Sequence, residues 1–310
     1  MRIALRARSS LHARTTSVCD TAGVSEVDRS AWFRWPQSYR ERPPLPELAP
    51  YVSCVWVQEV APDSPPFAFQ AVPNGSVEVV CVLGGLPYVI GIQSGLTREL
   101  LAPGTVMVGV RFRPGAAAPV MRTSAGEMVD LTIGCDDLWR GSALPVGSLL
   151  AAAGSPQEAA RVLEAEVLRR VRAATDLDPL VRSAVEMLVF DPANAVRALT
   201  TELHISDSQL RRRFMTAVGC PPKVLHRTLR FWGFLALAQS GPLRRRSLAA
   251  LAGSAGYADQ AHLARESVAI TGVAPSELLA GIERNCGENH NHAPTYLPLL
   301  RARQRAGHRR

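Results

Sequence analysis

The chain has 310 residues, of which 47% are hydrophobic and 20% charged. That balance excludes the collagen-like and wholly disordered classes of protein. Its length predicts about two domains, because one core rarely grows beyond ~250 residues. The net charge of +8 is unevenly placed, since residues 208–258 carry nine basic side chains and no acidic one. Such a block favours contact with a polyanion such as nucleic acid.

The two ends of the chain are basic and Arg-rich. Residues 1–36 have a net charge of +3 and residues 283–310 of +4. We expect a disordered extension (or a start codon placed too far upstream) and a disordered tail. Cys286, His290 and His292 in the tail lack a fourth ligand and a rigid frame, so no metal site is expected.

Residues 37–172 read as a β-rich domain. Gly84-Gly85 separates two Val/Ile-rich runs and predicts a hairpin between them. Ser155-Pro156 opens a run with apolar residues at helical spacing. Runs rich in Val, Ile and aromatic residues predict strands over residues 51–58, 76–83, 86–92 and 105–113.

Arg111 and Arg113 alternate with Val110 and Phe112, which predicts that both arginines lie on one strand face. Two adjacent guanidinium groups are candidates to hold a carboxylate or phosphate ligand. The alternative is a polar sheet face paired with nearby acids. No catalytic signature stands beside them, because no nucleophile elbow, phosphate loop or zinc-protease motif occurs.

The sequence of residues 176–282 predicts short helices, which form two similar helix-turn-helix units. A helix over 195–203 is followed by the capping box Ser206 to Gln209 and a second helix over 207–218. A short helix near 247–253 and another over 259–271 repeat this pattern. A long helix from Pro222 to about Gln239 lies between them. A short helix, a tight turn and a second helix form the helix-turn-helix motif, whose second helix enters the major groove of DNA.

The residues of this second part resemble those of AraC/XylS-type transcription regulators. The resemblance rests on GYADQAHLAR at 256–265 and TGVAP at 271–275, and it covers the whole DNA-binding domain of that family. Residues 39–44 (YRERPP), 72–76 (VPNGS) and 108–116 (VGVRFRPGA) resemble the amino-terminal module of an actinobacterial branch, to which no ligand is generally assigned.

The resemblance implies a role for individual side chains. Arg212 and Arg265 would contact guanine and Gln260 adenine, since these side chains match those base edges. The implied base-reading residues are Ser208, Arg211 and Arg212 in the first motif and Gln260, Ala261, Ala264 and Arg265 in the second. The implied phosphate contacts, which position the protein without reading sequence, are Lys223, Arg227, Arg244, Arg245 and Arg246.

The chain departs from the family pattern after Arg265. Family members usually place Phe and then a basic residue where this chain has Ser267 and Val268. Losing a buried Phe costs roughly 3 kcal/mol or more unless the site repacks. We therefore expect a less stable second motif, or one that reads DNA weakly.

Together these observations predict an α+β protein: a β-rich domain over residues 37–172, cupin-like or related, for sensing or dimerisation, and an all-α domain over residues 176–282 with two helix-turn-helix motifs joined by a long helix. The expected function is a sequence-specific DNA-binding transcription regulator, an activator or a repressor, without enzymatic activity and without a cofactor. The expected partners are double-stranded DNA, a small-molecule effector, a second copy of the chain and, for an activator, RNA polymerase, but no membrane.

With one Lys against 34 Arg, the composition is typical of a GC-rich bacterial genome, so we expect a cytoplasmic protein that is nucleoid-associated when bound to DNA.

Two alternatives stay open. The first is a DNA-binding module fused to an enzymatic or methyl-accepting domain, which needs a reactive cysteine, whereas Cys54 and Cys81 lie in apolar strands. The second is a first domain that binds a protein partner and no ligand.

Overall fold

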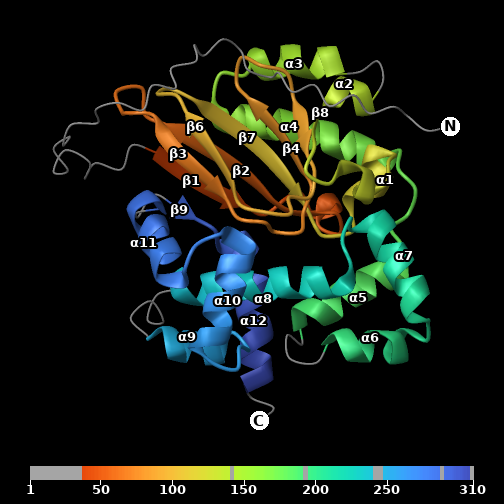
Figure 1. Cartoon of the computed structure of the whole chain (residues 1–310). Coiled ribbons are helices and arrows are strands. Elements are labelled where there is room, and N and C mark those ends of the chain that lie inside the picture. Colours follow the sequence, from red (N-terminus) through yellow and green to blue (C-terminus); the bar gives the residue numbers. More distant parts are fainter. Residues whose placement is uncertain (1–36, 140–142, 191–194, 240–246, 287–289, 308–310) are drawn as a thin grey trace.

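The computed structural model describes residues 37–139, 143–190, 195–239, 247–286 and 290–307. The extension predicted over residues 1–36 lies outside them. A β-rich part and a helical part lie one above the other in Figure 1. Helices α7 (Asp207–Ala217), α11 (Pro275–Cys286) and α12 (Ala293–Gly307) of the helical part contact the β-rich part. None of the described helices is long and apolar enough to cross a membrane.

The β-rich part is built on a seven-stranded sheet with the strand order β8-β5-β4-β7-β2-β1-β9, beside a separate pair β3-β6. The strands predicted over 51–58, 76–83, 86–92 and 105–113 are confirmed as β2, β4, β5 and β7. The predicted hairpin is also confirmed, because β4 and β5 pair antiparallel and Gly84 adopts a φ of +91° in the loop between them. The strands are β1 Gln37–Arg42, β2 Val52–Val60, β3 Phe67–Ala71, β4 Glu78–Val82, β5 Tyr88–Ile90, β6 Thr97–Leu101, β7 Val106–Phe112, β8 Thr132–Gly134 and β9 His290–Asn291.

The large sheet buries both of its faces, because alternate side chains of its central strands are apolar on each side. Val108 and Val110 of β7 belong to the core that helix α4 covers. Trp56 and Met107 belong to a second core on the opposite face, which the β3-β6 pair closes. The helical elements of this part are η2 Pro46–Leu48, α1 Ala117–Met121, η3 Ala125–Met128, α2 Cys135–Leu138, α3 Ala143–Ala151 and α4 Pro156–Arg172.

Gly109 makes the second core possible. A Cβ atom at this position would lie 2.2 Å from the indole ring of Trp56. The indole therefore lies directly on the β7 backbone, and its Nε1 donates a hydrogen bond of 2.8 Å to Glu78. Side chains of the protein itself occupy this face of the sheet.

The helical part has two cores that share the long helix α8. Leu225 and Leu229 from its first half pack with α5, α6 and α7, whereas Phe231, Phe234 and Leu235 from its second half pack with α9, α10 and α11. The predicted helix from Pro222 to Gln239 is confirmed as α8. The helices are α5 Pro179–Phe190, α6 Ala195–Leu203, α7 Asp207–Ala217, α8 Pro222–Gln239, α9 Leu248–Ser254, α10 Gln260–Thr271, α11 Pro275–Cys286 and α12 Ala293–Gly307.

The prediction of a disordered tail from residue 283 is wrong for most of that segment. Helix α11 continues to Cys286, β9 adds a parallel strand beside β1, and α12 packs on α8 and α5. Tyr296 and Leu299 lie one helical turn apart and are both buried. Burying that apolar face outweighs the Asn-, Pro- and Arg-rich composition on which the prediction rested.

Candidate DNA-binding surface

Helix α7 is held so that one of its faces points to solvent. Ser206 caps it, because its side chain accepts a hydrogen bond from the Gln209 amide while the Gln209 side chain accepts one from the Ser206 amide. Leu210 and Phe214, four residues apart, anchor the opposite face in the core. The capping box and this buried pair therefore fix the rotation of the helix about its axis.

The predicted base-reading residues of the first motif lie on the open face of α7. Ser208, Arg211 and Arg212 are all exposed. Arg213 is different, because its Nη1 lies 2.6 Å from the Asp178 carboxylate at the start of α5. The basic block is therefore free of acids in sequence but not in space, and sequence spacing gave no sign of this ion pair.

Helix α10 is built in the same way. Asp259 caps it by accepting a hydrogen bond of 2.6 Å from the His262 amide, and Gly256 supplies the turn with a φ of +81°. Leu263 is fully buried against α8 and α9. Of the residues predicted to read bases, Gln260, Ala261 and Arg265 are exposed and Ala264 is half-buried.

Ser267 occupies a fully buried position of α10 without leaving its hydroxyl unpaired. Its Oγ donates a hydrogen bond of 2.8 Å to the Val273 carbonyl. Thr271 donates a hydrogen bond of 2.8 Å to the Ser267 carbonyl. These bonds connect the end of α10 to the turn that follows it. The departure from the family pattern therefore leaves the buried Ser267 hydroxyl paired, so the site avoids the cost of an unsatisfied buried polar group.

The predicted phosphate contacts have different surroundings. Lys223 is exposed in the first turn of α8. Arg227 donates a hydrogen bond of 2.9 Å to Glu266 of α10, and Arg230 lies 3.4 Å from the same carboxylate and over the Tyr257 ring. Arg227 thus connects α8 to α10 in this structure rather than facing solvent alone. Arg244, Arg245 and Arg246 lie outside the described residues.

Glu266 is a contact residue between α10 and α8 that the sequence did not single out. Burial raises the pKa of its carboxyl group, but the hydrogen bonds and charges of Arg227 and Arg230 outweigh burial and hold the pKa below its ordinary value. A charged Glu266 therefore fixes α10 against α8. Its spacing from Arg227, 39 positions in sequence, is invisible to any local pattern.

Arg111 is buried among internal partners instead of lining an open ligand site. Its Nε donates to Glu78 at 2.8 Å, its Nη1 to Glu41 at 2.9 Å, and its Nη2 to the Tyr39 hydroxyl at 3.1 Å. Burial lowers the pKa of Arg111, but these neighbours outweigh it and raise the pKa above its ordinary value. The arrangement favours the alternative of a polar sheet face paired with nearby acids.

Arg113 lies just beyond the end of β7. Its Nε donates a hydrogen bond of 2.7 Å to the Ala49 carbonyl. Its side-chain partner therefore belongs to the segment after η2, whereas Arg111 faces Glu41 and Glu78 on the sheet. In this structure the two guanidinium groups do not share an acceptor.

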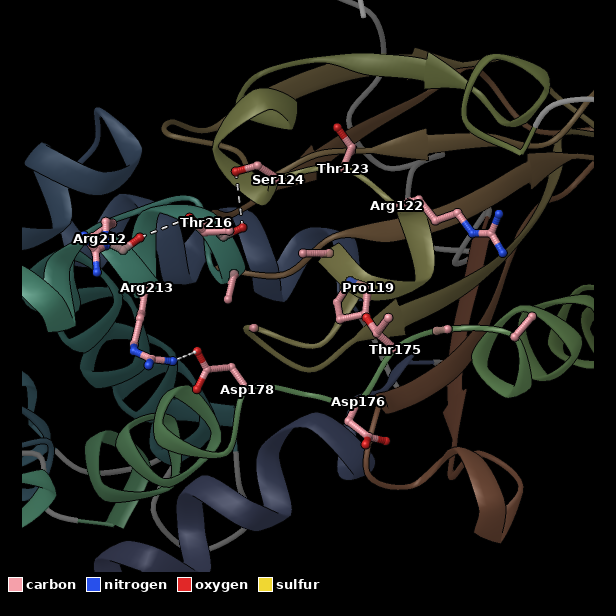
Figure 2. A pocket seen from close by; sticks show the side chains of 15 residues that line it. Pro119, Arg122, Thr123, Ser124, Thr175, Asp176, Asp178, Arg212, Arg213 and Thr216 are labelled. Carbon is pink, nitrogen blue, oxygen red and sulfur yellow. Dashed lines mark hydrogen bonds and ion pairs between the residues drawn. The ribbon is translucent and has the colours of Figure 1, made fainter. Parts of the chain in front are cut away.

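A hollow of about 750 Å³ lies between the β-rich part and the first motif. It is lined by the α1–η3 turn, by the linker before α5 and by α7. Figure 2 shows Ser124 directed toward Thr216 and Arg213 toward Asp178 across it. The Ser124 hydroxyl donates a hydrogen bond of 3.3 Å to the Thr216 carbonyl. The last turn of α7 is therefore attached to the β-rich part.

The described residues give little support to a reactive cysteine or to a metal site. Burial raises the pKa of Cys54 to about 12 and that of Cys81 to about 11. Neither thiol is a ready nucleophile at neutral pH, because the reactive form is the thiolate. Within the described ranges no group of three or more His, Cys, Asp or Glu side chains is placed to hold a metal ion.

Comparison with known families supports the two-part organisation. Residues 40–134 match a family described as a domain of unknown function (DUF6597), and residues 199–281 match a family described as a helix-turn-helix domain. The second match spans α7, α8, α9 and α10, and the AraC-type signature at 256–275 lies within it. The chain therefore carries a helix-turn-helix domain within residues 199–281, a type of domain that binds DNA. No curated protein matches the chain.

Several solved structures of ToxT from Vibrio cholerae resemble the chain. One at 1.65 Å resolution shares 13% identity with a TM-score of 0.38, covering 78% of this chain and 98% of ToxT. ToxT from strain SCE256 bound to an unsaturated fatty acid shares 11% identity with a TM-score of 0.37, covering 78% of this chain and 94% of ToxT. Identity at this level carries no function from one protein to the other.

Proposed function

We propose that this chain is a sequence-specific transcription regulator that places α7 and α10 in two successive major grooves of duplex DNA. The observation that carries the proposal is the arrangement of α8, which forms part of the core behind both helices while their polar faces stay exposed. At ~1.5 Å per residue, the 18 residues of α8 span ~27 Å, comparable with the ~34 Å of one DNA turn.

The exposed side chains supply the chemistry for reading bases. Arg212 on α7 and Arg265 on α10 can each donate two hydrogen bonds to O6 and N7 of guanine, and Gln260 matches adenine. Ser208 and Arg211 lie beside Arg212 on the same face. Lys223, exposed at the start of α8, is suited to a phosphate contact that positions the protein.

Contacts between the β-rich part and the first motif support control of that motif by the β-rich part. Besides the Ser124 to Thr216 hydrogen bond, a Cβ atom added to Gly126 of η3 would lie 2.9 Å from the Met215 carbonyl, so the backbones of η3 and α7 are in close contact. A ligand or partner that shifts η3 would therefore shift the last turn of α7. A small-molecule effector or a second copy of the chain fits this role, and RNA polymerase is the further partner of an activator.

The experiment is selection of binding sites by the full chain from random duplexes, followed by affinity measurements for Arg212→Ala. Loss of a guanine contact costs ~1–3 kcal/mol on the selected site and relaxes specificity at one base pair. Arg213→Ala is the matched control, because Arg213 is paired with Asp178, and it should keep the specificity. A uniform loss on all sequences would make Arg212 a phosphate contact, and failure to select any site would overturn the proposal.

A further inference from the structure

Val268 is an exposed apolar residue on α10, and a role for it in reading DNA rests on the proposed function. Val268 is 52% exposed, although the residue before it, Ser267, is fully buried. At ~100° per residue, Val268 lies ~20° from Ala261 and ~60° from Arg265 around the helix axis. It therefore shares the solvent-facing side of α10 with residues proposed to read bases.

The surroundings of Val268 are apolar. A shallow hollow in this face is lined by Ala264, Arg265, Val268 and Ala269. Three of these side chains are purely aliphatic, and the stem of Arg265 adds methylene groups. No described residue covers the side chain of Val268, which stays half exposed.

The position of Val268 in a DNA-binding helix determines what can fill this hollow. In the major groove, the bases present hydrogen-bonding atoms and one apolar group, the 5-methyl group of thymine. An aliphatic side chain makes no hydrogen bond to the polar edges, but it removes a methyl group from water at a gain in free energy. The guanidinium of Arg265 beside it supplies the charge that draws the helix to the DNA.

We propose that Val268 is a specificity-determining residue that selects thymine through its 5-methyl group. Val268 is three residues beyond Arg265, a rise of ~4.5 Å along the helix, whereas successive base pairs are ~3.4 Å apart. The thymine is therefore the neighbour, or next but one, of the base pair that Arg265 reads. This recognition adds a methyl contact to the hydrogen bonds of Gln260 and Arg265.

The experiment uses the full chain and the duplex obtained by site selection. Each thymine in the half-site bound by α10 is replaced in turn by deoxyuridine, which lacks only the 5-methyl group. Wild-type protein should lose roughly fourfold in affinity at one of these positions, the effect expected for burying one methyl group. With Val268→Ala, the ratio of affinities for thymine and deoxyuridine at that position should fall close to one.

Two controls make the result specific. Alanine is the best helix former, so Val268→Ala at an exposed helical position should keep the fold, which thermal unfolding will show. Val224→Ala removes another exposed valine, 42% accessible on α8, and should keep the full sensitivity to deoxyuridine. Equal affinity of the wild type for thymine and deoxyuridine at every position would overturn the inference, as would full sensitivity in Val268→Ala. If no duplex is selected at all, the proposed function itself fails.

Discussion

Arg111 and Thr295 are 184 positions apart in the chain, yet Nη1 of Arg111 donates a hydrogen bond of 3.1 Å to Oγ1 of Thr295. The same nitrogen donates to Oε1 of Glu41, whose Oε2 accepts a hydrogen bond of 3.1 Å from the Thr295 amide. Residues 290–301, which we call the strap, are thus attached to the sheet at this point. Because α12 also packs on α8 and α5, the strap joins the two parts of the molecule.

The first prediction concerns Thr295→Val, which keeps the shape of the side chain but removes its hydroxyl. Nη1 of Arg111 keeps Glu41 as an acceptor but loses the Thr295 hydroxyl, and a hydrogen bond that involves a charged group is worth about 1.5–3 kcal/mol. Denaturant unfolding should show this loss. Amide hydrogen exchange should rise in the strap before it rises in α4, because the hydrogen bond is lost at the strap itself.

Thr97→Val is the matched control for this substitution. Thr97 is exposed on β6, which pairs with β3, and valine suits a strand, so the unfolding free energy of Thr97→Val should stay within about 0.5 kcal/mol of wild type. If Thr295→Val has no larger effect than Thr97→Val, the hydrogen bond to Arg111 does not hold the strap.

The contacts of the strap could not be predicted from the sequence, whereas several local features could. The hairpin at Gly84, the capping box at Ser206 and the extent of α8 follow from local patterns, because each depends on residues a few positions apart. The pairing of Arg111 with Glu41 and of Arg227 with Glu266 depends on residues 70 and 39 positions apart. No periodicity encodes such pairs, so local patterns cannot separate an arginine free for a ligand from one that is paired.

The second prediction concerns pH and His290 of the strap. Burial, together with the nearby His292, lowers the pKa of His290 from 6.5 to about 3, and its Nε2 lies 2.7 Å from Oε1 of Gln37. The folded chain therefore keeps His290 neutral while the unfolded chain binds a proton below about pH 6.5. The stability that the folded chain gains from a neutral His290 is therefore complete above pH 6.5 and is lost progressively as the pH falls toward 3.

His290→Gln removes the titrating group. Its unfolding free energy should therefore change less than that of the wild type between pH 6.5 and 5. Glu41 does not mask the effect. Burial raises its pKa, but hydrogen bonds and charges from His292 and Arg111 bring it down to about 2, so stability from Glu41 is lost only below about pH 4.5. Exposed His204, changed to Asn, is the control and should keep the wild-type slope. An unchanged slope in His290→Gln would contradict a buried, neutral His290.

The third prediction concerns the second motif and Ser267→Ala. The motif departs from the AraC/XylS-type pattern at this position, and the Ser267 hydroxyl donates a buried hydrogen bond to the Val273 carbonyl. Removing the hydroxyl should lower the unfolding free energy by about 1 kcal/mol. The same change at Ser276, which is exposed on α11, should have little effect.

Ser267→Phe should lower the unfolding free energy more than Ser267→Ala does, because a larger side chain overpacks a fully buried site that its neighbours already fill. If Ser267→Phe were more stable than Ser267→Ala, the site would have room for an aromatic ring. The hydrogen bonds of Ser267 would then not be what stabilises this position.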